Sequence, residues 1–289
     1  MTLDIALPFY GDVGYLKAAV SSVLAQHDGR WRLLVVDDGY PDPEVGRWFA
    51  AITDPRVQYQ RNATNLGANG NYKRCLELIS SEYFMVMGAD DILLPDYVGH
   101  VLELLEQHKE VGVIQPGVEV IDESGNVIDP IVDRIKRAIR LPQGVHHGQR
   151  AATSLVRGNW SYFPSLVWNT ESVQALGFRA GLHVSQDLAL LIDVLCEGSD
   201  LLVMDEVVFQ YRRHTASDSS IKALNGARFA EESRLMKEMA TLFRSHRWYR
   251  AALAARMHIT SRLHAAVLIP KAIKHRKSPW ALIKHVFGS

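Results

Sequence analysis

The chain has 289 residues, of which 47% are hydrophobic and 22% are charged, so it can bury a large core as one domain or as a domain with an appendage. Its two cysteines, Cys75 and Cys196, lie in apparently helical stretches without metal-ligand spacing, which excludes a disulfide framework and is typical of reduced thiols. The chain opens without a basic segment that leads into an apolar one, and no run approaches the roughly 18 apolar residues of a membrane span, so we expect a cytoplasmic protein.

The first part of the chain alternates strands with helices. Apolar runs predict strands, and apolar residues at helical spacing predict helices. The predicted strands are 3–7, 31–36, 57–59, 83–87 and 111–114. The predicted helices are 16–24, a helix that starts at 42–43, 65–80 and 98–105. This alternation predicts an α/β fold with a mainly parallel sheet flanked by helices.

Regularity declines after residue 115. A turn at 122–126 predicts a hairpin between 118–120 and 127–128. Residues 129–158 are expected to form a basic connection with a helical piece at 131–139. A helix at 188–195 and a strand at 201–211 follow.

Two apolar strands end in paired carboxylates. Asp37 and Asp38 follow one strand, and Asp90 and Asp91 follow another. In an open α/β sheet, ligands bind outside the carboxyl ends of the strands, so these acids could face one nucleotide and its metal. The alternative is that the acids solvate turns or cap the next helix.

An ordered set of motifs runs through most of the chain. The motifs are Leu7-Pro8-Phe9-Tyr10 with 21–26, Val35-Val36-Asp37-Asp38-Gly39, Asn65-Leu66-Gly67 with Asn71, Gly88-Ala89-Asp90-Asp91 with Pro95-Asp96, Gln186-Asp187, and Tyr211-Arg212-Arg213-His214 with Ser217. Over about residues 3–220 they resemble the family 2 glycosyltransferases, which use nucleotide sugars and have a GT-A fold. A histidine stands where processive synthases of this family carry tryptophan, and the transmembrane channel of those synthases is absent, so the resemblance is to non-processive members.

The resemblance implies a GT-A type, Rossmann-like mixed sheet with a helical C-terminal extension. We expect a catalytic domain at 1–225, with a nucleotide-binding half at 1–115 and an acceptor half at 116–225. A basic helical extension at 226–289 completes the expected organisation.

The resemblance also implies a nucleotide site and a divalent cation, Mn²⁺ or Mg²⁺. The implied nucleotide-binding residues are Pro8, Tyr10, Asp38, Asn71, Ala89 and Asp90. A carboxylate such as Asp38 accepts hydrogen bonds from base N–H groups or ribose hydroxyls, and Tyr10 offers aromatic surface, with simple packing as its alternative role. The metal motif Asp-x-Asp of the family reads Gly88-Ala89-Asp90 here, so its first acid is missing. Asp91 either replaces that acid in part or caps a turn.

At the end of the 201–211 strand, the resemblance makes His214 a second metal ligand beside Asp90. It also places Arg213 on the diphosphate, where a cation offsets the charge of the leaving group. The alternative is a basic surface loop.

Asp187 is the predicted catalytic base, which takes the proton of the acceptor hydroxyl as that oxygen attacks the anomeric carbon and inverts it. Gln186 departs from the acid pair of the family, and a helix N-cap is the alternative role for Asp187. Trp160, Ser165 and Gln186 are the predicted acceptor residues. Trp160 could stack on a sugar ring, although a lone tryptophan beside Tyr162 more often belongs to the core.

These residues predict an inverting hexosyltransferase that acts on a saccharide or lipid-linked acceptor in cell-envelope glycan or glycolipid synthesis. One alternative is a non-catalytic nucleotide-sugar-binding or scaffold protein, which Gly88 and Gln186 favour. Another is a nucleotidyltransferase, although no Gly-rich basic stretch follows the first strand. No nucleic-acid partner is expected of such an enzyme.

The tail is strongly basic, since ten lysines and arginines and no acid follow Glu238. Ser278 and Pro279 start a short helix in which Trp280, Ile283, Val286 and Phe287 share one face, with Lys284 and His285 off it. This tail is expected to contact the inner face of the plasma membrane peripherally. The alternative is docking on the catalytic domain or in a homodimer.

Overall fold

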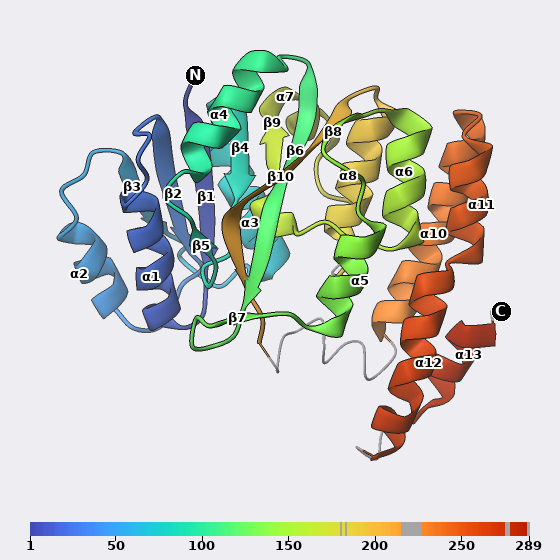
Figure 1. Cartoon of the computed structure of the whole chain (residues 1–289). Helices are drawn as coiled ribbons and strands as arrows, with labels where there is room; N and C mark the ends of the chain where they lie inside the picture. Colours follow the sequence, from blue (N-terminus) through green and yellow to red (C-terminus); the bar gives the residue numbers. More distant parts are fainter. Residues whose placement is uncertain (180, 183, 215–226, 275–277, 288–289) are drawn as a thin grey trace.

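The computed structural model describes residues 1–289 except 180, 183, 215–226, 275–277 and 288–289. One mixed sheet forms its centre, with the strand order β3-β2-β1-β4-β9-β6-β10-β5 and with β7 and β8 paired to β6 and β10 (Figure 1). The strands are β1 (Leu3–Phe9), β2 (Trp31–Asp37), β3 (Val57–Arg61), β4 (Tyr83–Val86), β5 (Ile92–Leu93), β6 (Val111–Ile121), β7 (Val127–Ile128), β8 (Gly144–His146), β9 (Val167–Asn169) and β10 (Asp200–Arg212).

Helices cover both faces of this sheet (Figure 1). They are α1 (Val13–Leu24), α2 (Glu44–Ala50), α3 (Gly67–Leu78), α4 (Tyr97–Gln107), α5 (Ile131–Ile139), α6 (Gly148–Arg157), α7 (Thr170–Leu176), α8 (Gln186–Cys196), α10 (Ala227–Ser245), α11 (Tyr249–Met257), α12 (Ile259–Lys274) and α13 (Trp280–Phe287), with a 3₁₀ turn at Phe163–Ser165.

The predicted mainly parallel sheet is confirmed, and the short strands β5, β7, β8 and β9 make it mixed because they pair antiparallel. β1 pairs in parallel with β2 and β4, β2 with β3, and β6 with β10. The short strand β9 lies antiparallel between β4 and β6. The parallel strands therefore end together, at the lower end of the molecule in Figure 1.

The less regular middle of the chain also folds largely as predicted. Val120 pairs with Ile128 in the expected hairpin, and α5 has the predicted bounds. β6 is longer than the predicted strand at 111–114, because its second half continues beside β10.

The alternation of side chains along the strands builds two separate cores. Leu33 and Val35 face a cluster with α1 and α4, whereas Leu34 and Val36 face a cluster with α3, α6 and α8. Both faces of β2 are thus buried, as its continuous apolar sequence predicts.

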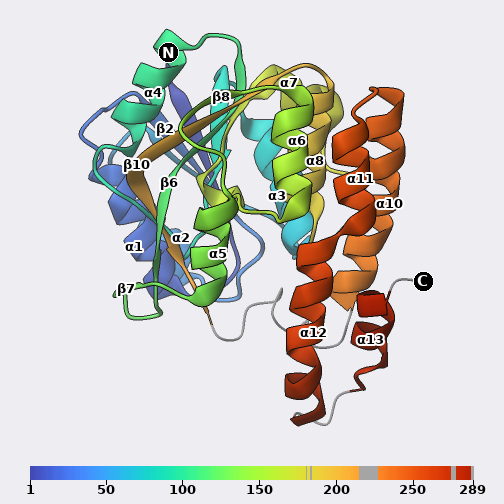
Figure 2. The ribbon, with the colours of Figure 1, turned by 45° about the vertical axis from the view of Figure 1, so that its right-hand side comes forward.

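The C-terminal helices belong partly to the second core. Leu235, Met239 and Phe243 of α10 pack in the same cluster as α6 and α8, and so do the alanines on the inner face of α11. α12 and α13 form a smaller cluster around Phe229 and Leu282. Figure 2 shows these last two helices extending below the rest of the molecule. The predicted boundary at 225/226 lies outside the described residues, and no helix of the described part has the length and apolarity needed to cross a membrane.

Candidate active site

Asp38 lies just beyond the end of β2 and is buried. Its Oδ1 accepts hydrogen bonds from Asn62 Nδ2 at 2.9 Å and from the backbone amide of Leu66 at 2.8 Å. Asn62 Nδ2 also donates to Asn71 Oδ1 at 3.0 Å, while Asn71 Nδ2 donates to the carbonyl of Val36 at 2.9 Å. Asp38 and Asn71, which the sequence predicted as nucleotide-binding residues, are therefore joined through Asn62.

Asp37 fixes the loop around this corner. Its Oδ1 accepts from the Tyr40 amide at 2.7 Å, and its Oδ2 accepts from the Tyr59 hydroxyl at 2.5 Å. The Tyr40 ring then lies edge-on to Tyr10, with centroids 5.7 Å apart. Tyr10 is 57% exposed, so its aromatic surface is open beside the predicted nucleoside position, while Pro8 is half-buried.

The missing acid of the metal motif has a steric explanation. A Cβ atom on Gly88 would lie 2.4 Å from Asp91 Oδ2 and 2.8 Å from Asp90 Oδ1. Asp91 is buried and its Oδ1 accepts the backbone amide of Arg212 at 2.8 Å, so this carboxylate cannot easily move. Burial and the charge of Asp90 raise the pKa of Asp91 well above its usual range. Asp91 therefore occupies space that a side chain at position 88 would need.

Asp90 meets the end of β10. Its Oδ2 lies 2.7 Å from His214 Nε2, and both side chains are partly open to solvent. Arg212 Nε donates to the Asp90 carbonyl at 2.7 Å and holds the two segments together. The half-buried Ala89 lies in the same loop, and Ser217 falls outside the described residues.

A carboxylate beside an imidazole suits Mn²⁺ or Mg²⁺, because such ions take one or two protein ligands and complete their coordination with water and phosphate oxygens. Asp90 and His214 could hold such an ion. Within the described residues, no group of three or more histidine, cysteine or carboxylate side chains is arranged to bind a metal. The predicted two-ligand site thus fits the geometry without being a closed metal cage.

Arg213 pairs with Asp133, a residue that the sequence did not predict as part of the site. Its Nε and Nη2 donate to the two oxygens of the buried Asp133 at 2.7 and 2.6 Å. The Tyr162 hydroxyl donates to Asp133 Oδ1 at 2.7 Å. Although burial opposes it, the bond from Arg213 lowers the pKa of Asp133. Arg213 is thereby oriented by α5, with its charge already paired.

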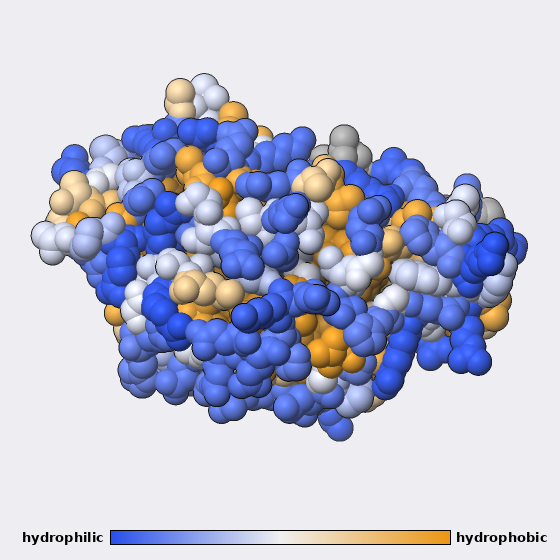
Figure 3. Space-filling model, turned by 90° about the horizontal axis from the view of Figure 1, so that it is seen from above, coloured by the Kyte–Doolittle hydropathy of each residue, from blue (hydrophilic) through white to orange (hydrophobic). Residues whose placement is uncertain are grey.

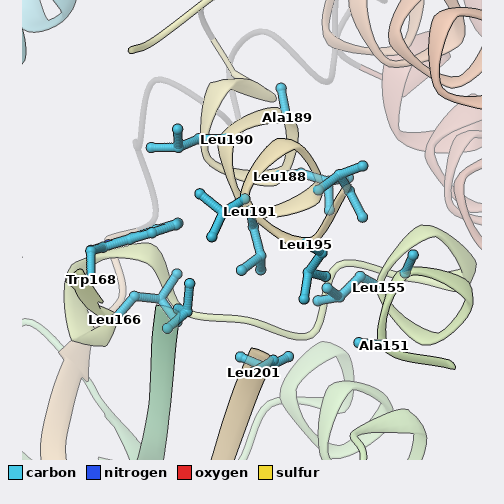
Figure 4. Close-up of a cluster of buried hydrophobic side chains, with 14 of the residues drawn as sticks. Ala151, Leu155, Leu166, Trp168, Leu188, Ala189, Leu190, Leu191, Leu195 and Leu201 are labelled. Carbon is cyan, nitrogen blue, oxygen red and sulfur yellow. The ribbon is translucent and has the colours of Figure 1, made fainter. Parts of the chain in front are cut away.

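Asp187 lies in the first turn of α8. Leucines on the following turns of α8 pack against α6 and β10, which fixes the helix (Figure 4). Ser185 precedes α8 as its N-cap, so the predicted N-cap alternative for Asp187 is wrong. Glu231 of α10 accepts the amides of Val184 and Ser185, both at 2.8 Å. The C-terminal helices therefore help to hold the segment that carries the predicted base.

The Asp187 carboxylate has one engaged and one unengaged oxygen. Asn159 Nδ2 donates to its Oδ2 at 3.3 Å, and its Oδ1 is buried without a hydrogen-bond partner among the described residues. Burial raises the pKa of Asp187, and the Leu188 amide and then the charge of Lys136 partly oppose this rise. An unengaged oxygen with raised basicity is what a general base requires.

Lys136 supplies that charge from the inner face of α5. Its Nζ donates to the Ser161 carbonyl at 3.0 Å and lies 4.1 Å from the centroid of the Tyr162 ring. Burial, with the nearby charge of Arg213, lowers the pKa of Lys136 to about 8.

Tyr72 on α3 is within electrostatic range of both predicted carboxylates. Burial raises the pKa of Tyr72 to about 12, and nearby Cys75, Asp90, Asp187 and Asp91 add to this rise. Tyr72 follows Asn71 on α3, the helix that also carries the hydrogen-bond partner of Asn62. A common site for Asp38, Asp90 and Asp187 stays a prediction.

Two predicted acceptor residues are placed differently. Trp160 is 1% exposed and its Nε1 donates to Ser154 Oγ at 3.0 Å, so its ring belongs to the core and offers no face to a sugar. Ser165 is fully buried, with its Oγ bonded to Gln115 Nε2 and to the Tyr162 carbonyl. These two acceptor assignments are wrong because neighbouring elements cover both side chains. Gln186 is also largely buried, next to Asp187.

The sequence missed several residues of this region, namely Tyr40, Asn62, Tyr72, Asp133 and Lys136. The only available signal was the strong segregation of charge on α5, where Asp133 and Lys136 are three positions apart.

Comparison with known proteins shows which family matches this chain. The model of the family described as glycosyl transferase family 2 matches residues 4–163, more than half of the chain. An uncharacterized glycosyltransferase of Rickettsia conorii is 31% identical over 127 residues, which are 43% of this chain and 20% of that protein. An uncharacterized protein of Sinorhizobium fredii is 29% identical over 130 residues, 44% of this chain and 14% of that protein. The chain thus spans one fifth or less of the length of these two relatives.

Solved structures extend the likeness to the whole fold. The structure of S. aureus TarS, residues 1–349, superposes on this chain with a TM-score of 0.68 at 12% sequence identity. The superposition covers 99% of this chain and 81% of the TarS chain. The TarS complex with UDP-GlcNAc gives a TM-score of 0.67 at 12% identity, with 99% and 82% covered. This likeness establishes the GT-A fold.

Proposed function

Because the chain belongs to the family 2 glycosyltransferases, we propose that it transfers a hexose from a nucleotide-diphosphate sugar to an acceptor hydroxyl, with inversion at the anomeric carbon. The proposal rests on Asp187, whose Oδ1 is buried without a hydrogen-bond partner among the described residues, together with Asp90, whose Oδ2 lies 2.7 Å from His214 Nε2. A single displacement needs a metal ligand on the side of the leaving group and a general base on the opposite side, and we assign these roles to Asp90 and Asp187.

The donor half of the site is proposed to lie along β2 and α3. Asp38 and Asn71, which are buried and joined through Asn62, are proposed to shape the floor of the nucleoside position, with Tyr10 on its exposed side and with Pro8 and Ala89 lining the same loops. A divalent cation held by Asp90 and His214 would neutralise diphosphate charge as the leaving group departs. The complexes of TarS with UDP-GlcNAc and with UDP support a nucleotide-sugar donor.

The acceptor half is proposed to lie between α5 and α8. Asp187 Oδ1 takes the hydroxyl proton, and Asn159 keeps the other oxygen in place. Arg213, which Asp133 pairs and orients, is proposed to donate hydrogen bonds to the diphosphate. Gln186 stands beside the base and is proposed to reach the acceptor only through the small part of the residue that is exposed. Residues 1–115 and 116–225 then correspond to the two halves of the catalytic domain.

The biological role is proposed to be the synthesis of a cell-envelope glycan or glycolipid, at the inner face of the plasma membrane. The basic tail supports this role, because an enzyme with a lipid-linked acceptor gains from proximity to an anionic leaflet.

A panel of nucleotide-diphosphate sugars, with and without Mn²⁺, tests the proposal. We expect one donor to raise the melting temperature and to release its nucleoside diphosphate only when metal and acceptor are present. NMR of the product should show the anomeric configuration opposite to that of the donor. A scaffold protein would be stabilised by the donor without cleaving it, and a nucleotidyltransferase would release pyrophosphate from a nucleoside triphosphate; either result would reject the proposed function.

A further inference from the structure

A cavity lies among α10, α11, α12 and α13, and none of the predicted catalytic or donor-binding residues lines it. Its volume is about 490 Å³. Four cations from four segments line it, namely Lys237, Arg256, Arg262 and Lys284, and the described lining residues include no aspartate or glutamate.

The histidines of this cavity do not account for its charge. His285 is bonded at both ring nitrogens, to Ser233 Oγ and to Ser261 Oγ, each at 2.9 Å. Burial lowers the pKa of His285 and lowers that of His258 to about 4, so both rings are neutral near pH 7. Glu232 lies behind them and is paired with Arg228 at 2.6 Å. The positive charge of the cavity therefore comes from its lysine and arginine side chains.

The residues around the cavity indicate what kind of anion it binds. All 32 acidic residues precede residue 239, whereas ten of the 32 lysines and arginines follow it, so the formal charge is −10 up to Glu238 and +10 after it. Trp280 and Phe287 of α13 are 74% and 79% exposed. Exposed aromatic side chains beside cations are typical of surfaces that contact the head-group layer of a bilayer.

The predicted apolar face of α13 is only partly correct, and the difference places these aromatic residues outward. Leu282 is buried, and Val286 and His285 pack towards α10 and α12, whereas Trp280 and Phe287 point away from that cluster. On α12, Leu263, Val267 and Ile273 are exposed as well.

The position of these helices fits a membrane contact. In Figures 1 and 2, α12 and α13 extend at the same end of the molecule as the carboxyl ends of the parallel strands. Figure 3 views the opposite end and shows hydrophilic residues over most of it, with apolar atoms in separate patches. A leaflet that contacted α12 and α13 would thus lie on the side of the predicted active site.

We propose that the cavity among α10–α13 binds the phosphate of an anionic phospholipid head group, while Trp280 and Phe287 enter the interface of the leaflet. This inference goes beyond the proposed function, because it concerns a second site whose occupation needs neither donor nor acceptor.

Sedimentation of the full chain with vesicles tests the proposal. We expect binding to phosphatidylglycerol-containing vesicles and at least about 10-fold weaker binding to phosphatidylcholine vesicles, since basic residues near the surface are attracted to the anionic lipid. Emission from Trp280 should shift to the blue on binding, and Trp280→Phe should abolish that shift. Equal binding to both vesicle types, or none, would overturn the proposal.

Matched charge removals separate a phosphate site from general attraction. Lys284→Gln and Arg256→Gln change the cavity lining, whereas Lys274→Gln removes an exposed charge at the same end outside the lining. We expect the two cavity variants to lose several-fold more affinity than Lys274→Gln, with melting temperatures unchanged. Equal losses in all three variants would refute the cavity site.

One more charge variant and a thermal melt with inorganic phosphate identify the ligand. Arg244→Gln removes a charge seven residues beyond Lys237 on α10, about 10 Å along the helix at 1.5 Å per residue, and should weaken vesicle binding less than the cavity variants because the Debye length is about 8 Å. Inorganic phosphate alone should not raise the melting temperature at millimolar concentration. If it does so through Lys284 and Arg256 while vesicles fail to bind, a soluble phosphate is the ligand and the lipid assignment is wrong. Transfer activity is measured separately and does not depend on either result.

Discussion

Charged groups differ between the carboxyl edge of the sheet and the C-terminal helices, in burial and in pairing. At the sheet edge, Asp37, Asp38 and Asp133 are buried and accept two or more hydrogen bonds each. On α11 to α13, cations surround a cavity and extend into solvent without an acid among the residues after Glu238. A buried charge must be compensated where it lies, whereas an exposed charge is stabilised by water.

The difference separates two uses of charge. Carboxylates held by a sheet keep fixed positions, which suits groups that must meet a reacting atom within a fraction of an ångström. Exposed cations attract an anionic partner over about a Debye length, before it reaches the cavity that we propose as its binding site. The two regions are nevertheless joined, since Glu231 of α10 holds the segment before Asp187.

Asp187→Asn tests the fixed-charge region with the largest expected effect. The change keeps the shape of the side chain but removes its basicity, so kcat should fall about 10²- to 10⁴-fold. Steady-state transfer assays measure this, and donor-induced thermal stabilisation should persist. Asp193→Asn on the same helix serves as the control, because Asp193 pairs with Arg179 rather than facing the cluster. An Asp187→Asn enzyme with wild-type kcat would show that Asp187 is structural only.

Phe243→Ala tests how far the C-terminal helices belong to the catalytic core. The Phe243 ring is fully buried and lies 6.0 Å from Trp248, so its removal should lower the free energy of unfolding by about 3–5 kcal/mol. Phe287→Ala, on the exposed side of α13, should change it by less than about 0.5 kcal/mol. Urea denaturation measures both values. Similar small losses for the two variants would mean that 226–289 is a separate appendage.

Gly88→Ala tests the crowding around Asp91. The added methyl group would meet Asp91 Oδ2 at 2.4 Å, so we expect a loss of about 1–3 kcal/mol in unfolding free energy. Gly88→Asp, which restores the family motif, should therefore reduce stability and activity rather than improve them. Combination with Asp91→Ala should recover part of the stability. Full activity in Gly88→Asp alone would contradict this packing explanation.

Lys136→Met tests charge compensation by pH dependence. Burial raises the pKa of Asp187 and Lys136 opposes the rise, so kcat/KM should fall as the pH decreases through a value above the usual aspartate range. Without Lys136 this acidic limb should move to higher pH, and Lys136→Arg should leave it nearly in place. An unmoved limb in Lys136→Met would exclude this role.

Lys136 should also affect how the free energy of unfolding depends on pH. The pKa of Lys136 is about 8 in the folded protein, below its ordinary value near 10.5. The charged lysine is therefore less favourable in the folded protein than in the unfolded chain, and this cost is complete below about pH 8. The free energy of unfolding of the wild type should rise as the pH increases from about 8 to about 10.5, because the unfolded chain then binds more protons than the folded protein. Thermal melts across that range should show this rise in the wild type and lack it in Lys136→Met.

Local patterns in the sequence determined the fold and the edge of the sheet on which the site lies. Alternating strands and helices predicted the sheet, and carboxylates after β2 and β4 predicted its functional edge, because the direction of a strand fixes where its end lies. The helix at α5 and the hairpin at β7 were likewise readable, since their signals span fewer than a dozen residues.

Tertiary structure decided what each side chain faces. The role of Gly88 depends on Asp91, which is itself fixed by Arg212 more than one hundred residues away. Trp160 and Ser165 had the composition of a sugar-binding segment, yet packing buried both. The sequence by itself thus determined the fold and the sheet edge that carries the site, because strand periodicity and strand ends are local properties. Only the packing of distant segments decided which groups stay open to a ligand.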